Sequence, residues 1–352
     1  ENLNDNNFTK VDTDVPNPTG TTDTLTNAQA RTGNQAYTGF VPQTITQKNI
    51  AGDGSTVVQV YYKRATNDVV VNNPSGSHIT STTGSENNVK YEKHITVTAT
   101  PDAGYYIDSW VDSKGNVVKQ GSEGNPAGSY EFDMPAEGVS LTPVALPKTN
   151  TPYKVKHWLQ NLNDDEYGAA PAVTEDKTGT TDTQTSAVAR TDLTGYTVVT
   201  SGAKAWSQAN IDGDGSTVVN IYYDRNRHDI KLYKDDSTTT KVTGDATDVK
   251  YGSEITVSAE PKPGYHFVGW ETLDGTPVSS DQTYIFTLGD EDVSLKAICE
   301  PDTNTPYTVE HWREKPDGNG YELYEVENMT GTTDAKTAAS ARTWTGFTTN
   351  FD

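Results

Sequence analysis

The sequence predicts a mainly β protein, a β-rich α+β chain in which small modules follow one another in an elongated array. Three observations support this prediction. The apolar residues, 32% of the chain, include many Val, Tyr and Trp, and β-branched and aromatic side chains suit the pleated surface of a sheet. Thr, Asn, Asp and Gly are abundant and predict many turns. Several phrases also recur about 150–160 residues apart, which indicates tandem modules.

The composition excludes several functional classes. The net charge of −22 repels phosphate backbones and anionic lipid headgroups, so we expect no nucleic-acid binding and no membrane binding. No apolar run approaches the ~18–20 residues that cross a bilayer. The sequence shows no signal peptide, which predicts a mature chain or a fragment. Cys299 is the only cysteine, so neither a disulfide framework nor a thiolate metal cluster is expected. Such cysteine poverty fits a secreted bacterial protein.

The internal repeats define two alternating modules, which we call A and B. In the A modules, "NTPYKVKHW" at Asn150 recurs as "NTPYTVEHW" at Asn304. In the B modules, "VKYEKHITVTATPDAGYYIDSW" at Val89 returns as "VKYGSEITVSAEPKPGYHFVGW" at Val249. The predicted boundaries are 1–65 (A), 66–148 (B), 149–226 (A), 227–303 (B) and 304–352 (A).

The A module is expected to contain three strands and one short helix. Alternation in Tyr153–Leu159 predicts a strand with His157 on one face and Trp158 on the other. A second strand is expected near 167–173. The phrase "TGTTD", which occurs three times, then offers helix-capping side chains, and the following "TQTSAVAR" predicts about two helical turns. "TVVNIYY" predicts the last strand, with Val219, Ile221 and Tyr223 on its inner face. This order is typical of a small β-grasp-like domain.

The B module is expected to contain strands only. "KYGSEITVSAE" alternates Ile255 and Val257 with polar neighbours, and "HFVGW" predicts a second strand after a "PKPGY" turn. The Asp-Gly pair at Asp274 predicts a hairpin. "TYIFTL" and "VSLKAIC" complete the sheet. Modules of about 75 residues sit near the lower limit of independent stability, so neighbouring modules are expected to pack end to end.

Both modules resemble repeats of bacterial surface proteins. At "GYHFVGW" and "VSLKAI" the B module is similar to the divergent internalin B-repeat family. From "TPYKVKHW" through "GTTDTQTSAVART" to "STVVNIYY", the A module resembles mucin-binding-protein-like (MucBP-type) β-grasp repeats of Gram-positive surface proteins. These resemblances imply a secreted or wall-anchored adhesin, outside the cell, whose repeats form a stalk. They imply no particular ligand residues.

Aromatic residues are the candidates for ligand binding, because Trp and Tyr rings can form stacking platforms for carbohydrates. Trp110 and Trp270 occupy equivalent strand positions and are expected in the cores. The candidates are Trp158 and its repeat equivalent Trp312, which are expected either at the surface or at an A–B junction, and Trp206, a loop residue without a repeat equivalent. Trp344 also lacks a repeat equivalent.

Metal binding and catalysis find little support in the residue pattern. Asp212 and Asp214 in "DGDGS" resemble part of a calcium loop, but no downstream Glu has the expected spacing, so an Asp-Gly turn is the favoured interpretation. Cys299 aligns with Ala145 and is predicted to be a buried structural thiol. The six histidines do not cluster, and no nucleophile–base pattern is recognisable. We therefore predict no enzyme.

The repeats at the two ends of the chain are incomplete. Glu1 to Phe8 aligns with "QNLNDDEY" at Gln160, so the first A module lacks its opening strand, and the last A module stops before a "GDGSTVV" strand. The predicted function is a stalk that projects a binding domain. Two alternatives stay open: weak direct binding of mucin or other glycans, strengthened by repetition, and a head-to-tail filament in which chains complete each other's sheets.

Overall fold

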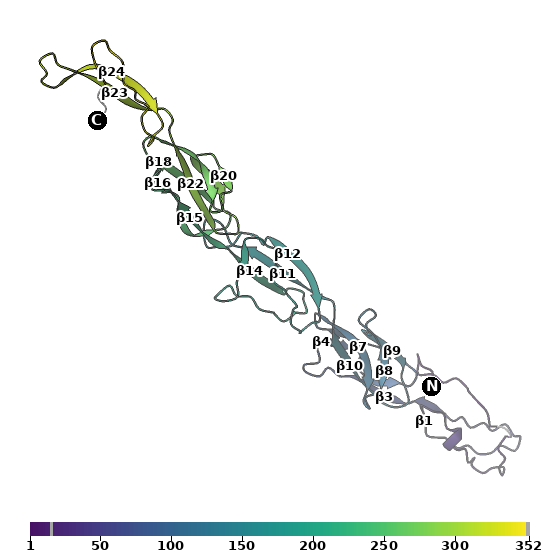
Figure 1. Ribbon diagram of the computed structural model, residues 1–352. Coiled ribbons are helices and arrows are strands. Elements are labelled where there is room, and N and C mark those ends of the chain that lie inside the picture. Colours follow the sequence, from purple (N-terminus) through teal and green to yellow (C-terminus); the bar gives the residue numbers. More distant parts are fainter. Residues whose placement is uncertain (15–16, 350–352) are drawn as a thin grey trace. The chain divides into compact units, whose positions relative to one another are not determined.

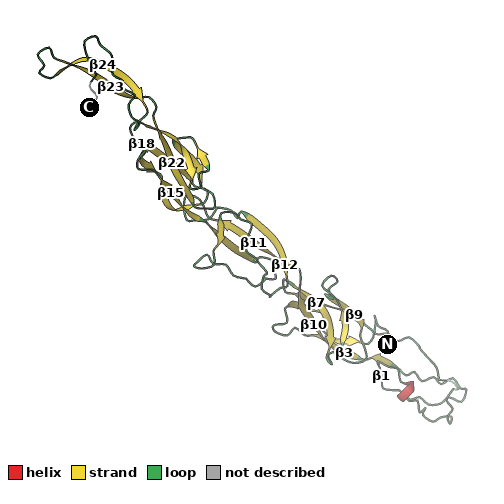
Figure 2. Ribbon diagram, in the orientation of Figure 1, coloured by secondary structure: helices red, strands yellow, loops and turns green. Residues whose placement is uncertain are grey.

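The computed structural model describes residues 1–14 and 17–349, and it confirms the mainly β fold class. In that part of the chain the only helical element is the 3-10 turn η1, Gly33–Gln35, and strands and loops make up the rest (Figure 2). None of its helices is long and apolar enough to cross a membrane. The backbone contacts divide the chain into two compact units: the first comprises Glu1–Val155, Glu175–Ala187 and Ser207–Val219, and the second Lys156–Thr174, Val188–Trp206 and Asn220–Asp352.

The first B module, in the first unit, contains two sheets. Its strands are β3 (Thr66–Val71), β4 (Ile79–Thr83), β5 (Glu86–Lys90), β6 (His94–Pro101), β7 (Tyr105–Asp112), β8 (Val117–Gln120), β9 (Ser129–Asp133) and β10 (Val139–Pro147). One sheet has the order β5-β3-β10-β7-β8 and the other the order β4-β6-β9 (Figure 1). β10 runs parallel to β3 and antiparallel to β7.

The second B module, in the second unit, repeats this arrangement strand for strand. Its strands are β15 (Arg227–Tyr233), β16 (Thr239–Thr243), β17 (Ala246–Lys250), β18 (Glu254–Pro261), β19 (Tyr265–Thr272), β20 (Pro277–Ser279), β21 (Thr283–Thr287) and β22 (Val293–Pro301). The sheets are β17-β15-β22-β19-β20 and β16-β18-β21. The predicted hairpin lies between β19 and β20, where Gly275 adopts the positive φ that the turn requires.

Each B module has a core formed by apolar side chains from both of its sheets. The predicted core tryptophans are confirmed, because Trp110 and Trp270 are both fully buried. Ile255 and Val257 are buried on β18 as their alternation predicts. Cys299 is also buried as expected, and its Sγ accepts a hydrogen bond of 3.3 Å from the Thr239 hydroxyl.

The central A module has a four-stranded sheet. Its strands are β11 (Thr151–Leu159), β12 (Val173–Gly179), β13 (Tyr196–Val198) and β14 (Val218–Arg225), in the order β12-β11-β14-β13. The outer A modules have smaller sheets, β1 (Phe40–Pro42) with β2 (Tyr62–Arg64), and β23 (Thr305–Glu314) with β24 (Tyr321–Gly331).

The alternation of the central sheet is as predicted. Val155, His157, Ile221 and Tyr223 are all buried on the inner face, whereas Trp158 lies on the opposite face. Two predictions for the other strands need correction. The second strand, predicted near 167–173, is β12, which begins at Val173. The short strand β13 was not predicted, because only three of its residues pair with β14.

The predicted helix after "TGTTD" is wrong. Thr183–Arg190 is irregular and extended, because its backbone groups are paired with another segment of the same module. The Thr185 amide donates to the Ala209 carbonyl at 2.8 Å, and the side chain of Gln208 bonds both the amide and the carbonyl of Ala187 at 2.9 and 2.8 Å. With Thr, Ser and Val lowering the local helix propensity, these tertiary bonds outweigh the helical ones.

Candidate functional site: the joints between modules

Repeated polar and close-packed contacts lie where one module meets the next. Two kinds of joint alternate along the chain. An A-to-B joint follows each of the first two A modules, and a B-to-A joint follows each B module. Each joint lies within one compact unit. We describe one example of each kind and then its repeat.

The A-to-B joint of the second unit closes around Gly195. This residue has φ +78°, and a Cβ placed on it would lie 2.2 Å from the ring of Tyr251. The Gly195 carbonyl accepts the Asn226 amide at 2.9 Å, and the Asn226 carbonyl accepts the Tyr251 amide at 2.8 Å. The guanidinium of Arg225 donates to the Tyr251 carbonyl at 2.9 Å. Only a glycine allows the tyrosine ring to lie against the backbone here.

The equivalent joint of the first unit has the same geometry. Gly39 has φ +76°, and a Cβ there would lie 2.4 Å from the ring of Tyr91. The Ala65 amide donates to the Gly39 carbonyl at 2.8 Å, the Tyr91 amide donates to the Ala65 carbonyl at 2.9 Å, and Arg64 donates to the Tyr91 carbonyl at 2.9 Å. The two joints therefore share their glycine, tyrosine and arginine.

One feature distinguishes these two joints. In the second unit, Asp290 accepts hydrogen bonds from the Gly195 amide at 3.1 Å and from the Asn226 side chain at 2.7 Å, and it lies 3.0 Å from Nε2 of His228. The bonds from Asn226 and His228 hold the pKa of Asp290 below its usual range. In the first B module the equivalent residue is Ala136, so this carboxylate belongs to one joint only.

The B-to-A joint of the first unit explains the repeated phrase "TGTTD". The Thr181 hydroxyl donates to the Gly104 carbonyl at 2.8 Å and shares a 2.7 Å hydrogen bond with Thr151. The Thr181 amide donates to the Lys148 carbonyl at 3.0 Å, and the Lys148 amide donates to the Gly104 carbonyl at 2.8 Å. Asp182 accepts a hydrogen bond from the Tyr105 hydroxyl. The phrase thus binds the Gly-Tyr turn of the preceding B module.

The B-to-A joint of the second unit repeats this pattern. Thr333 shares a hydrogen bond of 2.5 Å with Thr305, and its amide donates to the Asp302 carbonyl at 2.9 Å. The Tyr265 hydroxyl donates to Asp334. Asp182 and Asp334 both have φ +61°, a left-handed conformation that Asp tolerates better than most residues.

The "DGDGS" turn is also part of the B-to-A joint. A Cβ on Gly213 would lie 2.0 Å from the carbonyl oxygen of Ala103, which is a contact that only glycine permits. The calcium candidates flank this glycine, and each acts as an acceptor within the turn. Oδ1 of Asp214 accepts the Ser216 amide at 2.9 Å, and Oδ2 of Asp212 accepts the Thr217 hydroxyl at 3.2 Å. Within 1–14 and 17–349, no three His, Cys, Asp or Glu side chains are grouped to hold a metal ion.

The three candidate tryptophans do not come together. Trp158 is half-buried on β11 and its Nε1 donates to Asn220 at 2.9 Å, whereas Trp312 on β23 is 50% exposed. Trp206 is half-buried in the loop between β13 and β14. Of the two placements expected for Trp158 and Trp312, the outer face of the A sheet is therefore the observed one, and neither belongs to the joints described above.

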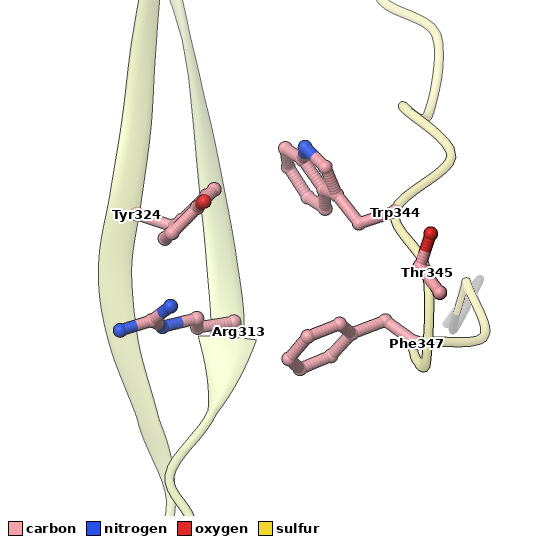
Figure 3. Close-up of a pocket in the computed structure, with 5 residues that line it drawn as sticks. All are labelled: Arg313, Tyr324, Trp344, Thr345 and Phe347. Carbon is pink, nitrogen blue, oxygen red and sulfur yellow. The ribbon is translucent and has the colours of Figure 1, made fainter.

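Trp344 packs within its own module beside a small cavity of about 190 Å³ (Figure 3). Its ring meets Tyr324 edge-on at 5.2 Å, and the Arg313 guanidinium lies 4.4 Å from the centre of the Tyr324 ring. Phe347 comes from the same segment as Trp344 and faces Arg313. Trp344 therefore has a packing role in this module.

The Tyr105–Asp182 pair of the B-to-A joint in the first unit predicts a loss of stability at alkaline pH. Burial and the bond to Asp182 raise the pKa of Tyr105 from 10.0 to about 12. The folded state therefore binds more protons than the unfolded state between these two values. We expect the contribution of this pair to the free energy of unfolding to be constant below pH ~10 and to fall as the pH rises toward ~12.

Denaturant titrations across this pH range test the expectation. The Tyr105→Phe variant should be about 1–2 kcal/mol less stable at neutral pH, because Asp182 loses its donor, and its stability should fall less between pH ~10 and ~12 than that of the wild type. The exposed-tyrosine variant Tyr61→Phe serves as the control. If the free energy of unfolding of Tyr105→Phe falls with pH as steeply as that of the wild type, the pair is not the source of this dependence.

Sequence reasoning missed the joint residues because each is an ordinary turn residue by itself. Gly39, Gly104 and Gly195 are three of many glycines, and "TGTTD" resembled a helix cap. Repetition was the sequence signal that could have identified these residues, since the glycine–tyrosine turn and the threonine–aspartate pair recur at the same positions of successive modules.

Among the comparisons with known proteins, a family model matches this chain twice. Residues 67–144 and 232–303, at the places of the two B modules, each match the family model of the divergent InlB B-repeat domain. The Bacillus anthracis TIE protein is a structural match with 7% sequence identity and a TM-score of 0.27. The match covers 72% of this chain and 53% of that one, so the chain spans about half the length of the TIE protein. The comparison with curated proteins gave no match.

Proposed function

We propose that this chain is a stalk segment of a bacterial cell-surface adhesin, which holds a binding domain away from the cell wall of a Gram-positive bacterium. The proposal takes the A modules as MucBP-like repeats, on the sequence resemblance, and the B modules as internalin-type repeats. The acidic, Thr-rich surface keeps such a segment soluble and makes neighbouring copies repel each other.

The observation that carries the proposal is the repetition of the joints. A tether needs only flexible linkers, whereas a stalk must resist bending at every module boundary. Here a glycine at each A-to-B joint lies against a tyrosine ring, and a threonine–aspartate pair at each B-to-A joint binds the turn before it. Contacts of this kind at a module boundary would resist bending there, which is the property that a stalk requires.

Small-angle scattering of the full chain tests this function through its radius of gyration. Strands of about ten residues give modules of roughly 30 Å, and five modules held end to end would have a radius of gyration of about 40 Å. A compact domain of this length would have about 20 Å and an unfolded chain about 65 Å.

We expect a value of about 40 Å that does not change with salt, because the joints depend on packing and short hydrogen bonds rather than on long-range charge. A value near 20 Å would contradict the stalk. A broad distribution of dimensions that shifts with ionic strength would indicate a flexible tether in its place.

A further inference from the structure

In each B module the first and the last strand are neighbours in the same sheet and run in the same direction. In the first B module β3 pairs in parallel with β10, and Val70 lies opposite Ser140 at the centre of the pairing. In the second B module β15 pairs in parallel with β22, and Leu232 lies opposite Leu295. We call β3–β10 and β15–β22 the terminal pairs, because the chain enters and leaves each module through them.

Short segments connect the terminal pairs to the strands of the neighbouring modules. Ala65 alone separates β2 from β3, and residues 148–150 separate β10 from β11. In the second B module, Asn226 alone separates β14 from β15, and residues 302–304 separate β22 from β23. A pull on the chain therefore reaches both strands of each terminal pair without a long linker that could extend first.

Tension along the chain acts on a terminal pair in shear. The chain enters the first strand at its amino end and leaves the last strand at its carboxyl end, and in a parallel pair these two ends point in opposite directions. Tension therefore pulls the strands past each other along their own axes, so that all the hydrogen bonds between them resist it together. In an antiparallel hairpin the two ends lie side by side, and the bonds break one after another.

The position of each terminal pair in its sheet protects these hydrogen bonds from water. Both strands are internal, since β5 and β7 flank β3 and β10, and β17 and β19 flank β15 and β22. The side chains that these four strands direct into the two cores include the buried Val69, Leu141, Ile230 and Leu295. Water therefore cannot replace a bond of the terminal pair until the strands have moved apart.

Asn72 adds a side-chain connection to the terminal pair of the first B module. It directly follows β3, and its backbone amide donates to the Leu141 carbonyl at 2.8 Å. Its side-chain nitrogen lies 3.0 Å from the Ser140 hydroxyl, 3.1 Å from the Thr142 hydroxyl and 3.2 Å from the Leu141 carbonyl oxygen. In the second B module Tyr233 has the equivalent position and extends the pairing from three register pairs to four. Both terminal pairs are thus reinforced at this end, by different means.

We infer that the B modules resist tension along the chain, and that the terminal pairs are the elements that carry it. The hairpin β23–β24 of the last A module provides the contrast. It has ten register pairs, more than either terminal pair, but tension enters it at Thr305 and leaves it at Gly331, which lie opposite each other. The hairpin should therefore open at a lower force than a B module. This inference does not depend on the stalk function, because a flexible tether would transmit tension through the same strands.

Single-molecule stretching of the full chain, held at its two ends, tests the inference. Rupture of the first terminal pair releases the chain from Val69 to Leu141, which is about 250 Å when extended, whereas the hairpin releases about 90 Å. A Gly-Ser insert of about ten residues between Lys114 and Gly115, in the turn from β7 to β8, lengthens the step of the first B module by about 35 Å and so identifies it. We expect the hairpin step at the lower force and the B-module steps at the higher force.

Two variants locate the resistance within the first B module. Asn72→Ala removes the side-chain connection to β10 and should accelerate the rupture of this module about tenfold at constant force, while the second B module keeps its wild-type rate. Thr98→Val is the control. It removes the 2.7 Å hydrogen bond between the hydroxyls of Thr83 and Thr98, which connects β4 and β6 in the other sheet of the module. Its rupture rate under force should equal that of the wild type, and thermal unfolding confirms that both variants are folded.

Three outcomes would overturn the inference. The first is a step of the B modules at or below the force that opens the hairpin. The second is a rupture rate of Asn72→Ala equal to that of the wild type. The third is an equal acceleration by Thr98→Val and Asn72→Ala, which would show that the general stability of the module, rather than its terminal pair, determines its resistance to tension.

Discussion

Replacing Gly195 by alanine is expected to open the A-to-B joint of the second unit. The φ of +78° costs an alanine about 1–2 kcal/mol, and the new Cβ would lie 2.2 Å from the Tyr251 ring, so the ring must leave its position. We expect a total loss of about 3 kcal/mol in the local free energy of opening. The amides of Asn226 and Tyr251, which bond across the joint, should then exchange more than about 100-fold faster with solvent deuterium.

Gly202→Ala is the matched control for this variant. Gly202 lies in the same module at φ +77°, but a Cβ there would meet nothing within 4 Å. It therefore carries the conformational cost without the collision, and exchange at the two joint amides should stay at the wild-type rate. Equal effects of the two variants would mean that backbone conformation, rather than contact with Tyr251, holds the joint.

Replacing Gly213 by alanine should have a comparable effect on the B-to-A joint of the first unit. Its φ lies outside the left-handed region, so the expected cost comes from the new Cβ, which would lie 2.0 Å from the carbonyl oxygen of Ala103. A backbone atom cannot rotate away as a side chain can, so the modules must separate. We expect a loss of about 2–4 kcal/mol and strongly accelerated exchange of the Lys148 and Thr181 amides, which bond within this joint.

The repeat itself supplies the control for Gly213→Ala. Gly52 occupies the equivalent position of the first A module, and a Cβ there would make only an ordinary contact of 3.5 Å with Thr22. Gly52→Ala should therefore be neutral or slightly stabilising, since alanine restricts the unfolded chain more than glycine does. Wild-type exchange at Lys148 and Thr181 in Gly213→Ala would show that this joint is open in solution.

The two kinds of joint place different demands on the sequence. The A-to-B joint depends on shape, with a tyrosine ring against a bare backbone, and Asp290 strengthens one of its two copies. The B-to-A joint depends on short polar side chains, whose hydrogen bonds reach from one module to the turn of the other. The stability of the array therefore rests on a few glycines and threonines that contribute little to any module core.

The sequence by itself determined the mainly β fold and the residues that fill the cores of its sheets. Period-two patterns place Val155, Val257 and Ile221 inside, and the repeat-equivalent Trp110 and Trp270 are buried in both B modules. These properties are local, because burial on a strand follows from the side-chain alternation of the strand itself.

The tertiary structure decided what joins the modules and how the segment after "TGTTD" folds. Thr181 bonds Gly104, which lies 77 residues earlier in the chain, and Gln208 holds Ala187 in an extended segment where local propensity predicted a helix. The close approach of two backbones at a glycine cannot be predicted from hydrophobic periodicity, because glycine has no side chain that would contribute to the pattern. The contacts that the repeated phrase makes with distant segments are therefore set by the tertiary structure alone.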